Sequence, residues 1–173
     1  MSTIMNQNEQ LSATAAPQEN PDTTQFEEVL TRFADMLDHA DFGAQLETLG
    51  IGRFQFARRK HAREELAAMY VGLWKLALNR SFPIEANALL EKFLTQLCET
   101  KSKSKRRKQE HFVALCREYV HVLQTSGDTN FIQIAVLLCQ HLDCHDQDAL
   151  RRISLQIALD MRAMYHHIFE RLI

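Results

Sequence analysis

The chain has 173 residues, of which 46% are hydrophobic and 24% are charged, close to the composition of ordinary globular domains. With 20 Lys and Arg against 22 Asp and Glu, the formal net charge is −2, which excludes a uniformly basic polyelectrolyte binder. The five Gly and three Pro are too few for the many tight turns of a β-sandwich or barrel, so the composition favours long helices joined by short connections.

The first segment, residues 1–22, lacks the periodicity of a helix or a strand. It is rich in Asn, Gln, Ser and Thr and contains Pro17 and Pro21, so we expect a disordered N-terminal arm. The chain does not open with a basic segment followed by an apolar run, which argues against a secretory signal. We expect residues 23–173 to form a single helical-bundle domain.

Apolar residues recur at helical spacing in six later segments. The predicted helices cover about 25–39, 53–78, 83–99, 109–124, 131–142 and 148–173. A short helical turn is expected at 41–49, ended by Gly50 and Gly52. The sequence therefore predicts an all-α protein, a compact bundle of about six helices behind the disordered arm.

Two of these helices carry further expectations. Residues 131–142 are apolar almost all round, which predicts a helix surrounded by others at the centre of the fold. The last helix has a main apolar row and a second row that includes Leu155 and Leu159, which predicts packing against two neighbours. The same pattern suits half of an intertwined homodimer. The most apolar stretch, 129–140, is too short to cross a bilayer, so no membrane association is expected.

Positive charge is concentrated in two stretches, residues 51–63 and a link expected at 101–108. Together they hold 11 of the 20 Lys and Arg and no acidic residue, whereas the rest of the chain carries nine cations against all 22 acids. These cations are the candidate binding residues: Arg53, Arg58, Arg59, Lys60, Arg63, Lys101, Lys103, Lys105, Arg106, Arg107 and Lys108.

The two basic stretches suit an anionic partner. Lys and Arg neutralise phosphates, and Phe54 and Phe56 among the arginines could stack on bases or bury against a protein. A solvated helix start and a solvated loop would carry the same charges. The tight turn at 125–129 leads into the apolar helix 131–142, which cannot present polar side chains to a DNA groove. A nucleic acid would therefore be contacted through its backbone.

A cluster of four soft or borderline ligands is the weak candidate for a metal site. Cys139, His141, Cys144 and His145 read C-x-H-x2-C-H, which does not match the paired spacing of common zinc sites. The alternative is a buried Cys139 with His residues at a helix end, where a cation is mildly favourable. No metal or other cofactor is predicted.

No motif of a known catalytic class is present, so the chain is not predicted to be an enzyme. It lacks G-x-S-x-G, H-E-x-x-H and the Gly-rich phosphate loops. Glu118 and His121 form one E-x-x-H, but a di-iron bundle needs a second copy, and we expect both side chains to face solvent.

The sequence predicts a non-enzymatic cytoplasmic interaction module, such as an adaptor, chaperone-like factor or regulator, that docks an acidic protein partner through a basic surface. The alternative is a nucleic-acid-associated regulator that contacts the phosphate backbone through the same residues. The four Cys suit reduced thiols in the cytoplasm, and a homodimer is compatible with the pattern. Both interpretations require the two basic stretches to meet on one surface.

Overall fold

The computed structural model describes residues 21–99, 103–126, 131–144 and 147–172, and within them the expected all-α bundle is confirmed. The described residues form seven helices and no strand. These are α1 (Pro21–Asp38), α2 (Gly43–Thr48), α3 (Phe56–Ser81), α4 (Ala86–Cys98), α5 (Lys103–Ser126), α6 (Ile132–His141) and α7 (Gln147–Leu172). Helix α2 corresponds to the short turn expected at 41–49. Helix α1 begins at Pro21, inside the expected arm, and residues 1–20 lie outside the described part of the chain.

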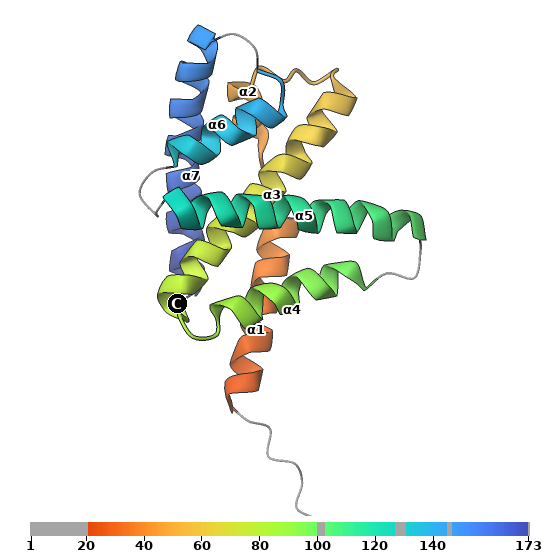
Figure 1. The fold of residues 1–173 in the computed structure, drawn as a ribbon, viewed down its shortest axis with the longest axis vertical. Coiled ribbons are helices and arrows are strands. Elements are labelled where there is room, and N and C mark those ends of the chain that lie inside the picture. Colours follow the sequence, from red (N-terminus) through yellow and green to blue (C-terminus); the bar gives the residue numbers. More distant parts are fainter. Residues whose placement is uncertain (1–20, 100–102, 127–130, 145–146, 173) are drawn as a thin grey trace, which may run out of the picture.

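Helix α3 is the centre of the bundle. It runs between α5 and α7 (Figure 1), and every residue from Ala68 to Leu78 is buried. The expectation that residues 131–142 form the central helix is therefore wrong. Helix α6 is short and packs mainly on α7, and its Ile132 is 48% exposed.

Lys75 lies in this core and is only 2% exposed. Its ammonium donates a hydrogen bond to Asn79 Oδ1, one turn further along α3. Burial lowers the pKa of Lys75, because removal from water disfavours the charged form.

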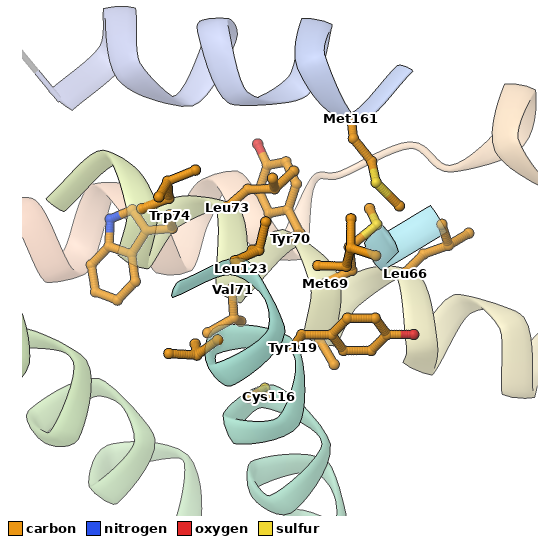
Figure 2. Close-up of a cluster of buried hydrophobic side chains, with 14 of the residues drawn as sticks. Leu66, Met69, Tyr70, Val71, Leu73, Trp74, Cys116, Tyr119, Leu123 and Met161 are labelled. Carbon is orange, nitrogen blue, oxygen red and sulfur yellow. The ribbon is translucent and has the colours of Figure 1, made fainter. Parts of the chain in front are cut away.

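Helices α3 and α5 cross in close contact at Gly72. A Cβ atom at this position would lie 2.9 Å from Leu123 Cδ1 and 3.4 Å from Tyr119 Cβ, so the missing side chain lets the two helices approach. Figure 2 shows the α5 side chains Cys116, Tyr119 and Leu123 beside those of α3. On either side of this crossing α3 and α5 diverge (Figure 1).

An aromatic cluster holds α1 and α4 against α3. The ring of Phe33 stacks on that of Trp74, with centroids 4.1 Å apart and planes at 4°. Phe93 meets both rings edge-on, at 5.1 Å and 5.2 Å. Such pairs add to the stabilisation from apolar burial alone.

The two apolar rows of the last helix are buried to different degrees. Ile157, Met161 and Ile168 are buried, whereas Leu155 and Leu159 are 55% and 54% exposed. The expected packing of this helix against two neighbours is confirmed, since α7 contacts both α3 and α6. Of the second row, Phe169 packs partly against the core, whereas Leu155 and Leu159 do not contribute. None of the helices in the described part of the chain combines the length and the apolar character needed to span a bilayer.

Candidate functional site

The two basic stretches meet between α3 and α5. From their crossing at Gly72 the helices diverge toward their N-terminal ends, which extend to the same side of the molecule (Figure 1). The space between them is a crevice of about 500 Å³. We call it the basic crevice; it is lined by Lys60, Glu64, Arg107, Lys108 and His111.

The second basic stretch is helical, and the expectation of a basic link at 101–108 is wrong from residue 103 onward. Helix α5 begins at Lys103, since Lys, Arg, Gln and Glu are good helix formers and nothing between 103 and 110 breaks the helix. The cations of the described residues 105–108 therefore sit on a regular helix, which fixes their directions. Lys101 and the side chain of Lys103 lie outside the described residues.

Most of the candidate cations are free of internal carboxylates. Two of them have a described contact: Arg106 Nε lies 3.0 Å from Glu110 Oε1, and Arg58 Nη2 donates to the Leu142 carbonyl at 3.4 Å. Within the described residues the others form no ion pair: Arg53, Arg59, Lys60, Arg63, Lys105, Arg107 and Lys108. Arg59 is half-buried and the rest of this set is exposed.

The cations stand where helix electrostatics disfavours them. A helix N-terminus carries a partial positive charge and normally prefers Asp or Glu in its first turn. Neither α3 nor α5 has an acid there, and both carry cations in the first turn instead. Two positive helix ends and their Lys and Arg side chains thus add up to one strongly positive region, which favours an anionic ligand.

Two exposed aromatic side chains lie where the chain enters α3. Phe54 is 90% exposed and Phe56 is 74% exposed, although large apolar side chains are usually buried. Phe56 is the first residue of α3, one turn before Lys60 of the basic crevice.

A buried polar network lies next to the crevice and was not recognised from the sequence. Glu65 is 3% exposed and accepts hydrogen bonds from Tyr119 Oη at 2.6 Å and His141 Nδ1 at 2.9 Å. His141 Nε2 lies 3.5 Å from Glu118 Oε1, and His61 Nε2 contacts the His141 carbonyl at 3.3 Å. The network joins α3, α5 and α6, so it holds the two walls of the basic crevice at a fixed separation.

One residue of this network, Glu65, could have been recognised from the sequence. Glu65 lies between the buried residues Ala62 and Leu66, within the buried stripe of α3. An acid in such a stripe requires partners, because a buried unpaired carboxylate is very costly. Tyr119 and His141 come from distant parts of the chain, and the sequence alone did not pair them with Glu65.

The candidate metal ligands do not converge. Both ring nitrogens of His141 face carboxylates. Cys139 and Cys144 lie close together because of the backbone geometry at the end of α6. The end of α6 is a Schellman motif in which Cys144 N–H bonds the Cys139 carbonyl at 3.0 Å, and these two positions normally touch. His145 lies outside the described residues, and in the described part of the chain no three His, Cys, Asp or Glu are arranged to hold a metal ion.

The protonation of Cys139 agrees with a packing role. Burial and the neighbouring Cys144 raise the pKa of the Cys139 thiol to about 12, so at neutral pH it holds its proton. Glu118 and His121 are exposed, as expected from the sequence, although Glu118 also reaches His141.

Comparison with known protein families, with curated proteins and with solved structures finds no match to this chain. The function is therefore inferred from the chain's own geometry, of which the basic crevice is the feature both basic stretches share.

Proposed function

We propose that the chain is a protein-interaction module that docks an acidic segment of a partner protein in the basic crevice. One observation carries the proposal: α3 and α5 bring Lys60, Arg107 and Lys108, none of them paired with an internal carboxylate in the described residues, to the walls of one opening. Carboxylates of a partner would form ion pairs with these three cations. Phe54 and Phe56 would supply apolar contact at the edge of the same site.

Glu64 favours a protein partner over a phosphate backbone. Its side chain lines the crevice, where a carboxylate repels any anion but can accept hydrogen bonds from peptide N–H groups, which a phosphate backbone lacks. The chain as a whole is also slightly acidic, with a net charge of −2, so its long-range field does not attract an extended polyanion. A short acidic segment needs only the local positive region.

Two probes of matched charge test the proposal. An octapeptide of alternating Glu and Ala, N-acetylated and C-amidated, and a thymidine pentanucleotide each carry about four negative charges and can be fluorescently labelled. We expect the peptide to bind more tightly, and its affinity to fall with salt because charge pairs at an exposed site are screened. Replacing Glu64→Gln should strengthen binding of the oligonucleotide more than binding of the peptide, because only the peptide loses hydrogen bonds to the carboxylate. The measurement is fluorescence anisotropy at two salt concentrations.

The matched control uses cations elsewhere on the surface. A triple variant, Lys60→Glu, Arg107→Glu and Lys108→Glu, should weaken peptide binding by at least roughly tenfold, or about 1.4 kcal/mol. A second triple variant, Arg151→Glu, Arg152→Glu and Arg162→Glu, makes the same change of net charge on exposed positions of α7 and should bind as the wild type does. Equal losses in both variants would contradict a localised site. Tighter binding of the oligonucleotide, strengthened further by Glu64→Gln, would favour the nucleic-acid alternative instead.

A further inference from the structure

A second cavity lies on another part of the molecule and shares no lining residue with the basic crevice. Its volume is about 950 Å³, within the range of small-molecule sites. It is bounded by α1, the segment from Ala40 through α2, α7 and a single side chain of α3, Tyr70. Figure 2 shows the Tyr70 hydroxyl directed toward α7, the helix of Met161.

One end of the cavity is acidic. Asp160 of α7 accepts hydrogen bonds from Gln45 Nε2 at 3.3 Å and Gln156 Nε2 at 3.1 Å, and Asp41 accepts one from the Gly43 N–H at 2.9 Å. Gln45 and Asp41 line the same cavity, so the two carboxylates lie at the α2 end. Neither forms an ion pair with Lys or Arg in the described residues. This end therefore favours a ligand group that is a cation and a hydrogen-bond donor.

The other end of the cavity carries the cation of Arg171, with Arg32 and Asp35 of α1 also in its lining. Arg171 follows Asp160 by 11 residues on α7, which places its Cα about 16 Å further along the helix axis. Helices α1 and α7 run in opposite directions (Figure 1), so Arg32, in the middle of α1, lies toward the Arg171 end. Arg32 pairs with Glu28 at 2.5 Å, which leaves Arg171 as the main positive charge at this end.

The wall between the two ends is largely apolar and carries one central hydroxyl. Met36, Phe42, Met164 and the ring of Tyr70 line this part. Burial raises the pKa of Tyr70 and the Arg171 charge acts in the opposite direction, so Arg171 lies within electrostatic reach of the hydroxyl. At neutral pH the hydroxyl is protonated and can both donate and accept hydrogen bonds.

We propose that this cavity binds an elongated zwitterion of the size of a tripeptide, with its amino group between Asp41 and Asp160 and its carboxylate at Arg171. An extended tripeptide is about 10 Å long, so with the Arg171 side chain reaching inward both charged ends are satisfied at once. The apolar wall contacts the ligand's middle, and the Tyr70 hydroxyl can bond a peptide group.

The peptide Ala-Leu-Ala, with free or capped termini, is the probe. We expect the wild-type chain to bind the free peptide in the millimolar range or tighter, and N-acetylation or C-amidation each to weaken binding by about tenfold, as expected for loss of a charge-assisted hydrogen bond. Asp160→Asn should reduce the effect of N-acetylation and leave that of C-amidation unchanged, since Asp41 still faces the amino group. Arg171→Gln should abolish the effect of C-amidation alone. Isothermal titration calorimetry measures all of these affinities.

Two variants of the same helix serve as controls. Glu170→Gln and Arg162→Gln change exposed side chains of α7 outside the cavity, and both should keep the wild-type response to each cap. The capping of the peptide tests the proposal on the wild-type chain, so it does not depend on the folding of any variant. Absence of binding at about 10 mM peptide, or affinities that ignore both caps, would overturn it. Because the probe and the residues differ from those of the basic crevice, this result is independent of the proposed docking function.

Discussion

The same two helices, α3 and α5, form both a close crossing and an open basic crevice. At Gly72 they approach so closely that a single added methyl group would meet Leu123. Three turns away, at Lys60 and Lys108, they stand apart and line the basic crevice with side chains that lack internal partners in the described residues. One helix pair thus has two different parts: the crossing packs the fold, and the diverging ends carry the proposed docking site.

The largest expected effect is at the crossing. Gly72→Val should lower the free energy of unfolding by about 3 kcal/mol, because a branched side chain overpacks the contact with Leu123 and Tyr119. Urea denaturation checks the value. The matched control is Gly52→Val, since a Cβ at Gly52 meets nothing within 4 Å, and there we expect a change below about 0.5 kcal/mol. Similar losses at both glycines would break the comparison.

The next effect concerns the network between the crossing and the crevice. Tyr119→Phe removes one of the donors to the buried Glu65 carboxylate and should cost about 2 kcal/mol at neutral pH. Tyr165→Phe is the matched control, because the buried Tyr165 hydroxyl has no partner in the described structure, and its loss should cost little. If the two variants were equally stable, Glu65 would not depend on Tyr119.

The network also predicts a response to alkaline pH. Burial, followed by the hydrogen bond to Glu65, raises the pKa of Tyr119 above its usual value of 10.0. A group with a raised pKa stabilises the fold fully below its unfolded pKa and loses that contribution as the pH rises beyond it. Stability should therefore fall above about pH 10, and less steeply in Tyr119→Phe. Thermal unfolding followed by circular dichroism between neutral and alkaline pH measures both slopes.

A smaller effect of opposite sign is expected for the buried ammonium of α3. Burial lowers the pKa of Lys75 below its usual value of 10.5, so the charged form opposes folding at neutral pH. Lys75→Met keeps the apolar stem and should raise the free energy of unfolding by about 1 kcal/mol at pH 7. The advantage should shrink as the pH rises toward 10.5, because the folded wild type is then relieved of the charge. A loss of stability in Lys75→Met would show that the hydrogen bond to Asn79 outweighs the cost of burial.

The smallest effect concerns the end of α6, which contacts Arg58 beside the crevice. Asp143 has φ of 51° at the left-handed position of the Schellman motif, the position that Gly50, with φ of 66°, occupies after α2. Asp143→Gly should stabilise the chain by about 0.5 kcal/mol, since glycine adopts this conformation without strain. Differential scanning calorimetry detects the shift, and a lower melting temperature would contradict this reason.

Periodicity was enough to predict the helices but not their order of burial. Leu66, Met69, Tyr70 and Leu73 marked the buried face of α3 correctly, whereas the apolar residues 131–142 were wrongly placed at the centre. How deeply a helix is buried depends on how many neighbours surround it, and the local sequence does not contain that number. Leu155 and Leu159 failed as packing residues for the same reason.

The candidate site was predictable in composition and not in geometry. The cations were visible as two runs, but helical structure at Lys105–Lys108 and the contact of Arg58 with the Leu142 carbonyl were not. The helical structure of this segment was missed because a run of charges was interpreted as a loop, although Lys and Arg are good helix formers. The second depends on a tertiary contact that joins residues 84 positions apart.

The most direct test of the account maps the acidic octapeptide on the protein by backbone NMR. On titration with the peptide, the account predicts that amide shifts concentrate in residues 56–64 and 103–111, with few changes near Gly72. The triple variant at Lys60, Arg107 and Lys108 should lose these shifts and keep its melting temperature, because exposed charges contribute little to stability. Shifts centred on α7, or none at all, would contradict docking in the basic crevice.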